Sequence, residues 1–219
     1  MIAPFVGAAV GLVAGLVSER LVVALPVAIE DALEQPAWTR SIRRPPALEV
    51  AGVALGVAAG LAVGWRVELL PALVLVALLV PVIFVDIAHR VIPDRIVLPG
   101  TLVGLGVWAA IDLAAVPEHL AGAVIGFAAF LLMALASPAG MGMGDVKLAL
   151  MLGAFLGWSI VPAIVASFLL SLVPSLVILV LRGWREGRKT TLPFGPFLAL
   201  GGVVGALFGQ AMIDLYVGG

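Results

Sequence analysis

The chain has 219 residues, of which 63% are hydrophobic and only 11% are charged, and its mean hydropathy is +1.25. Soluble globular domains carry about 25% charged residues, so water is not the main solvent of this protein. The formal net charge of −1 provides no basic surface for nucleic acid. The absence of cysteine excludes disulfides, thiolate nucleophiles and cysteine-based zinc sites, and the two histidines, His89 and His119, are too few for a histidine-built metal site.

Apolar runs long enough to cross a bilayer recur along nearly the whole chain. We expect eight helices, at residues 2–25, 47–65, 68–87, 96–114, 119–136, 145–157, 160–181 and 196–216. The first is interpreted as a retained transmembrane helix, because no Lys or Arg precedes Arg20 as the basic region of a secretory signal would. The predicted fold is all-α, a polytopic transmembrane bundle forming one membrane domain over residues 1–219, with residues 26–46 as a short cytoplasmic loop.

The predicted sixth helix, at residues 145–157, is short. Roughly 13 residues at a rise of 1.5 Å reach only about 20 Å, whereas the hydrocarbon core is about 30 Å thick. Either this helix begins inside a polar recess or it spans only half of the bilayer. Because non-helical backbone at that depth needs protein or water beside it, we expect a cavity near residues 140–144.

The basic residues define an orientation. Eleven of the 12 Lys and Arg residues fall in segments that the eight-helix topology places on one face, and only Arg66 falls on the other. Loops rich in Lys and Arg are cytoplasmic, so that face is predicted to be cytoplasmic and both termini to lie outside.

Acidic residues in membrane helices are costly and mark functional sites by default. Four candidates lie near helix ends, where an interfacial or structural role is the better interpretation: Glu19, Glu49, Asp112 and Asp214. Two others differ, because Asp86 ends the apolar run 78–85 and Asp145 follows the glycine-rich stretch 140–144. The predicted topology places both at the same depth on the cytoplasmic face.

Two carboxylates held close together cannot both ionise easily, so one keeps a proton. Such a pair can activate water with one oxygen while the protonated partner polarises a scissile carbonyl. The structural alternatives are that Asp145 is a helix N-cap and that Asp86 pairs with Arg90. Neither alternative explains the glycines before Asp145, which would let an extended substrate backbone approach closely.

The stretch Met141-Gly142-Met143-Gly144-Asp145-Val146-Lys147-Leu148 resembles the signature of the type IV prepilin peptidases, the GxGD aspartyl proteases of bacterial and archaeal membranes. Three further stretches are similar to motifs of that family: Val85-Asp86-Ile87 with Ile92-Pro93-Asp94 and Leu98-Pro99, then residues 153–158, then residues 192–199. The resemblance covers roughly residues 86–201. A lone GxGD is a weak signal, but a GMGDVKL stretch with an upstream aspartate at the expected place is a strong one.

The resemblance implies an inner-membrane aspartic endopeptidase that removes the basic leader of type IV prepilin or pseudopilin precursors at the cytoplasmic edge, with Asp86 and Asp145 as the catalytic pair. Many members also methylate the new N-terminal amine with S-adenosylmethionine. The long cytoplasmic zinc loop with paired cysteines is absent here, which argues against a methyltransferase role and a metal site. We therefore expect a peptidase without a cofactor, with membrane lipid and a pilin-like precursor as partners and no nucleic acid.

Six residues are predicted to contact substrate: Gly142, Gly144, Lys147, Pro193, Phe194 and Gly195. For Lys147 an equal alternative is a side chain that extends to the interface. Asp94 is expected to be an N-cap and His89 a solvated loop residue, and His119 receives no role. Two other functions were weighed: a proton-coupled transporter that uses the same carboxylates as a relay, and an inactive scaffold for pilus assembly. The edge positions of the acids argue against the first, and the retained aspartates against the second.

Overall fold

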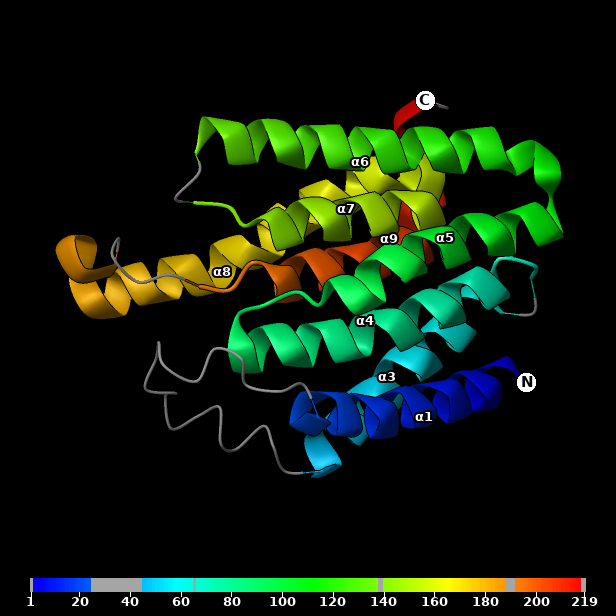
Figure 1. Cartoon of the computed structure of the whole chain (residues 1–219), viewed down its shortest axis with the longest axis horizontal. Helices are drawn as coiled ribbons and strands as arrows, with labels where there is room; N and C mark the ends of the chain where they lie inside the picture. The colour runs from blue at the N-terminus through cyan, green and yellow to red at the C-terminus, as the bar shows by residue number, and fades with distance from the viewer. Residues whose placement is uncertain (1, 25–44, 65, 138–139, 188–191, 218–219) are drawn as a thin grey trace.

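The computed structural model describes residues 2–24, 45–64, 66–137, 140–187 and 192–217 (Figure 1). That part of the chain is helical and contains no strand, which confirms the all-α class. Its α-helices are α1 (Ala3–Ala24), α3 (Pro45–Val63), α4 (Leu69–His89), α5 (Asp94–Ile111), α6 (Val116–Ala136), α7 (Met143–Leu156), α8 (Ile160–Gly187) and α9 (Gly195–Val217). Two short 3-10 turns, η1 (Leu113–Ala115) and η2 (Gly157–Ser159), precede α6 and α8.

The eight predicted helices correspond to these eight in order, and their ends differ by a few residues. The fourth ends at Ile111 rather than residue 114, because the Asp112 side chain accepts a hydrogen bond from the Ala114 amide at 2.9 Å and starts η1. Helix α7 begins two residues before Asp145, and α8 continues to Gly187 past a non-helical Gly183. Most of the predicted 26–46 loop lies outside the described residues, and its last two residues begin α3.

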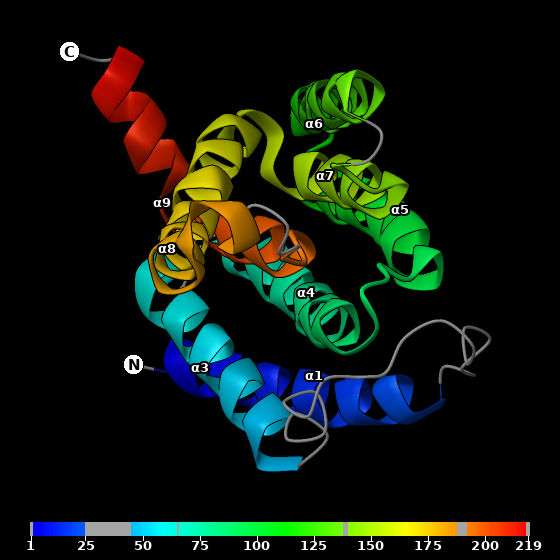
Figure 2. The ribbon, with the colours of Figure 1, turned by 90° about the vertical axis from the view of Figure 1, so that its left-hand side faces the viewer.

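Helix α4 lies at the centre of the bundle (Figure 2). It contacts α1 and α3 on one side and α5, α7 and α9 on the other. Its sequence is apolar on every face, and a helix that is hydrophobic all round is a buried one. The core accordingly includes Leu75, Leu79 and Val82 of α4, each with at most 1% of its surface exposed.

Five apolar helical stretches of the described chain are long enough to cross a bilayer: Leu69–His89, Asp94–Ile111, Leu113–Ala136, Met143–Gly183 and Gly195–Tyr216. The fourth combines α7, η2 and most of α8. Shorter apolar stretches occur in α1 and α3, at Ala3–Leu16 and Val50–Val63. Helix α7 alone is 14 residues, about 21 Å, so the prediction of a short helix after the glycine-rich loop is confirmed.

Glycines let neighbouring helices approach each other closely, first at the contact between α7 and α6. A Cβ at Gly153 of α7 would lie 2.2 Å from the backbone oxygen of Gly122 in α6. A Cβ at Gly122 would lie 2.4 Å from the oxygen of Gly157. Gly7 and Gly11 of α1 approach Gly56 and Gly52 of α3 in the same way, with Cβ-to-oxygen distances of 1.9 Å. In membranes, where lipid is as apolar as leucine, such backbone contacts hold helices together.

The substitution Gly153→Ala should therefore separate α7 from α6. We expect a loss of about 1–3 kcal/mol in unfolding free energy, the range for overpacked cores, since only backbone could move aside. Thermal unfolding in detergent micelles measures it. The control is Gly106→Ala in α5, where a Cβ meets nothing within 4 Å. Equal melting temperatures for the two variants would contradict this packing.

Candidate active site

Two aspartates from different helices lie at one end of the bundle, where α4 ends and α7 begins; these helix ends are on the left in Figure 1. Asp86 is in the last turn of α4, and Asp145 is the third residue of α7. They are close enough that the charge of Asp145 acts directly on Asp86. Asp86 and Asp145, which the sequence predicts at the same depth, thus lie at the same end of the bundle, although they are 59 positions apart in the chain.

The Asp86 carboxyl is enclosed by protein. Only 5% of the residue is exposed. Gly195, the first residue of α9, lies against it: the backbone of Gly195 hydrogen-bonds the carboxylate, and a Cβ at this glycine would lie 2.5 Å from Oδ2. Gly195 was predicted to contact substrate, and the structure places it in contact with Asp86.

Arg90 shapes the end of α4. It has a left-handed backbone with φ of 54°, and its amide donates to the Asp86 carbonyl at 2.8 Å. This cap ends the helix one turn after Asp86 and reverses the chain toward α5. The charges of Arg90 and Asp145 act on the Asp86 carboxyl in opposite directions, because Arg90 favours its ionised form and Asp145 disfavours it.

Asp145 is half-buried and does not cap its helix. The N-cap of α7 is Gly142, with extended φ and ψ of −82° and 151°, and Asp145 lies inside the first turn, its amide bonded to the Gly142 oxygen at 3.2 Å. The N-cap interpretation of Asp145 is therefore wrong. A Cβ at Gly142 would lie 3.8 Å from Asp145 Oδ2, an ordinary contact, and Gly142 is exposed.

The buried side chain of Ile92 joins the segments that carry the two carboxyls. A Cβ at Gly144 would lie 2.9 Å from Cβ of Ile92, and one at Gly195 would lie 3.2 Å from its Cδ1. Ile92 follows Asp86 by six residues, so the connection between α4 and α5 packs under both glycine-containing segments. The missing side chains of Gly144 and Gly195 thus let α7 and α9 approach this connection closely.

Lys147 and Asp94 form an ion pair, with Nζ and Oδ2 2.6 Å apart. Their side chains are 29% and 53% exposed. The predicted N-cap role of Asp94 is wrong, because Pro93 occupies that position and Asp94 is the first residue of α5. The Lys147 side chain, for which the sequence also allowed an extension to the interface, thus forms a bond that links α5 to α7 two residues after Asp145.

The remaining predicted contacts lie before α9. Pro193 and Phe194 are half-buried. The Phe194 ring packs against Phe168 of α8 and Phe130 of α6, with centroid distances of 5.4 Å and 6.1 Å. This aromatic cluster holds the start of α9, and with it Gly195, against the bundle.

The surroundings of the two histidines differ from those predicted from the sequence. His89 is the last residue of α4, and its Nε2 is buried without a hydrogen-bond partner, so the prediction of a solvated loop histidine is wrong. His119, which received no role, is 5% exposed and stacks on Trp108 at a centroid distance of 4.1 Å. Across the described residues, no group of three or more His, Cys, Asp or Glu side chains could hold a metal ion.

Comparison with known proteins adds an independent observation. Residues 73–181, which include Asp86 and Asp145, match the model of the type IV leader peptidase family. The chain is 38% identical to the leader peptidase HopD of Escherichia coli over 144 residues, which make up 62% of this chain and 91% of that protein. The chain belongs to this family. Its predicted membership is confirmed.

Other relatives are longer. The chain is 31% identical over 183 residues to a prepilin leader peptidase/N-methyltransferase of Legionella pneumophila, and 34% identical over 178 residues to one of Pseudomonas putida. The matches cover 80% and 76% of this chain but only 62% and 59% of those proteins. No solved structure matches the chain.

Family membership and the apolar helices together identify a multi-pass inner-membrane protein. The comparisons give no support to the alternative prediction of a proton-coupled transporter, since the relatives reported above are leader peptidases.

The Lys147–Asp94 bond is testable without any assay of activity. A double-mutant cycle of Lys147→Gln and Asp94→Asn should give a coupling energy of about 0.2–1 kcal/mol, because partly exposed ion pairs are screened by water. Chemical unfolding in mixed micelles at low and high salt measures it, and the coupling should shrink with salt. A coupling of zero at low salt would show that the pair does not form.

Proposed function

We propose that this chain is an aspartic endopeptidase that removes the basic leader of type IV prepilin-like precursors, with Asp86 and Asp145 as the catalytic pair. The observation that carries the proposal is the convergence of these two carboxyls from α4 and α7 at one buried end of the bundle. Both lie in the region matched by the family model. The leader peptidase names of the relatives supply the substrate class.

The reaction needs only the two carboxyls and water. The ionised carboxylate takes a proton from water as the water oxygen attacks the peptide carbonyl carbon, and the protonated partner donates to the carbonyl oxygen. Collapse of the tetrahedral intermediate breaks the C–N bond: the departing amine takes up the proton held by the first carboxyl, and a hydroxyl of the intermediate returns its proton to the second carboxylate. Burial of Asp86 excludes competing water from this exchange.

The end of the bundle that carries Asp86 and Asp145 is assigned to the cytoplasmic side, and both chain termini to the outside. The assignment is supported by the basic residues Arg90, Arg95 and Lys147, which lie at that end, and by Arg66 alone at the other. A precursor would then bring its basic leader along the anionic inner leaflet and its apolar helix beside the bundle. Lys147, Gly142, Gly144 and Pro193 border the path proposed for the precursor.

The activity that we propose is that of a peptidase, and N-methylation is not assigned. The chain covers 91% of HopD, whose name contains only the peptidase, and about three-fifths of the two bifunctionally named proteins described above. No cysteine is available for the zinc loop expected of methylating members. Type IV prepilin or pseudopilin precursors are therefore the only substrates proposed.

The substitutions Asp86→Asn and Asp145→Asn should each lower cleavage of a prepilin-type precursor by about 10²–10⁴-fold, because each removes one member of the acid–base pair. Asparagine keeps the size and the hydrogen-bonding capacity of the side chain. The assay uses purified protein in liposomes and detects the shortened precursor by mass spectrometry. The matched control is Asp214→Asn in α9, an exposed carboxyl outside the site, which should cleave normally. Near-normal cleavage by Asp145→Asn would end the proposal.

Two glycines in the site should respond differently to one added methyl group. Gly195→Ala places Cβ 2.5 Å from Oδ2 of Asp86, so the carboxyl must move, and we expect about a 100-fold loss of cleavage rate. Gly142→Ala makes only a 3.8 Å contact with Asp145 at a φ and ψ that alanine adopts freely, so the rate should stay within about twofold. Melting temperatures show whether both variants fold. A Gly195→Ala enzyme that folds and cleaves normally would remove Asp86 from the mechanism.

A further inference from the structure

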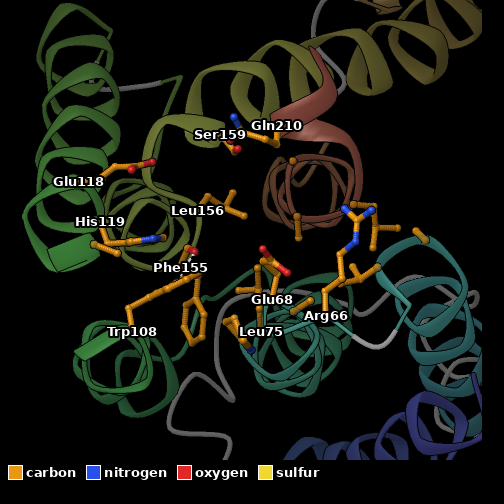
Figure 3. A pocket seen from close by; sticks show the side chains of 18 residues that line it. Arg66, Glu68, Leu75, Trp108, Glu118, His119, Phe155, Leu156, Ser159 and Gln210 are labelled. Carbon is orange, nitrogen blue, oxygen red and sulfur yellow. Dashed lines mark hydrogen bonds between the residues drawn. The ribbon is translucent and has the colours of Figure 1, made fainter. Parts of the chain in front are cut away.

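A cavity of about 360 Å³ opens at the end of the bundle opposite the two aspartates (Figure 3). It is lined from the α3–α4 connection and from the nearby ends of α4 to α7 and α9, with Glu68, His119 and Gln210 among its residues. Along α4, Glu68 and Asp86 are separated by about 27 Å, at 1.5 Å per residue. That is close to the thickness of the hydrocarbon core, so the cavity lies at the depth of the lipid headgroups on the other face of the membrane.

The cavity has an apolar floor and a charged rim. Leu75, Phe155 and Leu156 form the floor, and all three are buried. The charged groups on the rim are Arg66, Glu68 and Glu118, all exposed. Among the residues that the structure places, neither Arg66 nor Glu68 has an ion-pair partner, since Lys147–Asp94 is the one such pair found. Figure 3 shows the Arg66 guanidinium and the Glu68 carboxylate on the same part of the rim, with no hydrogen bond drawn between them.

His119 adds a neutral hydrogen-bonding group to the wall. It is 5% exposed, stacks on Trp108, and its ring reaches from α6 toward the cavity (Figure 3). Its Nδ1 is buried without a hydrogen-bond partner. Ser159 and Gln210 supply further polar atoms on the far wall.

We propose that this cavity binds the headgroup of a phospholipid that carries both a phosphate and a primary ammonium group, as in phosphatidylethanolamine. Arg66 pairs with the phosphate, since a guanidinium matches its geometry. Glu68 and Glu118 accept from the ammonium, and Ser159 and Gln210 bond the remaining oxygens. The apolar floor takes the hydrocarbon next to the headgroup.

The charges select this headgroup over others found in membranes. One cation and two carboxylates disfavour a purely anionic headgroup such as phosphatidylglycerol, which brings no cation to either glutamate. A choline headgroup has the same charges but no N–H donors, so it cannot hydrogen-bond the carboxylates. The outer position of the cavity also separates this site from the proposed peptidase chemistry, and lipid binding can be read without any cleavage assay.

Native mass spectrometry of the full chain in detergent, titrated with phosphatidylethanolamine, phosphatidylglycerol, phosphatidylcholine or free phosphoethanolamine, tests the proposal. We expect one phosphatidylethanolamine to bind about tenfold or more tightly than the other two lipids. That ratio of dissociation constants corresponds to the free energy of one charge-assisted hydrogen bond. Free phosphoethanolamine should bind much more weakly than the lipid, because it lacks the hydrocarbon that contacts the floor. Binding of free phosphoethanolamine as tight as that of the lipid would assign the cavity to a soluble ligand and overturn the proposal.

Two variants separate the roles of the rim charges. Arg66→Gln should weaken phosphatidylethanolamine and phosphatidylglycerol alike, about tenfold or more, whereas Glu68→Gln should weaken only phosphatidylethanolamine. Glu68 makes no side-chain cap bond to α4, so its substitution leaves the helix intact. The charge-matched control is Arg95→Gln at the other end of the bundle, which should bind as the unaltered protein does. Equal affinity for all three lipids, or a Glu68→Gln variant that keeps the preference, would overturn the assignment.

Discussion

The arrangement of the bundle depends on placing two carboxyl groups beside each other in a protein with very little polar interior. Moving a carboxyl out of water costs several kcal/mol unless partners compensate it. Here the compensation comes from backbone: Gly195 offers its amide to Asp86, and the Asp145 carboxyl lies over the start of α7 near Gly142. Backbone can approach a carboxyl this closely only where no side chain intervenes. The glycine at position 195 is therefore a requirement of the buried Asp86 carboxyl rather than an independent feature.

The short helix α7 connects this requirement to the rest of the molecule. Its first turn carries Asp145, and its last turn ends beside the cavity that contains His119. Close packing on α6 through Gly122 and Gly153 fixes its position, and Gly157, with φ of 55°, turns the chain into α8. A longer helix would carry one of these two ends past the depth at which it functions. The short length of α7, from which the sequence predicted a recess, thus reflects a helix whose two ends both contact neighbouring helices.

Hydropathy and charge were sufficient to predict the helices and the shared depth of Asp86 and Asp145. The positions of the helices and the depth of the two residues both depend on the free energy of moving side chains between water and lipid, and hence on local composition. Contacts between helices were not predictable in the same way. The Lys147–Asp94 pair and the position of Gly195 against Asp86 join residues 53 and 109 positions apart, and no periodicity encodes them. The capping predictions for Asp94 and Asp145 failed because Pro93 and Gly142 have extended backbone and begin the helices earlier. The burial of His119 depends on Trp108 of another helix, for which its own neighbours in sequence give no signal.

The two proposed sites lie at opposite ends of the bundle, and α4 runs between them. Between Leu75 at the cavity and Asp86 at the other end, its buried side chains are hydrocarbon, including Val76, Leu79, Val80 and Val82. A relay of carboxylates needs acids at intervals through the midplane, and the described part of α4 carries none between Leu75 and Asp86. In the proposed mechanism this apolar stretch separates the paired aspartates from the outer face, so a proton that they share would exchange with the side on which a substrate would arrive. That isolation suits hydrolysis at a membrane edge, where the water that reacts must enter from one side and the apolar segment of the substrate must remain in lipid.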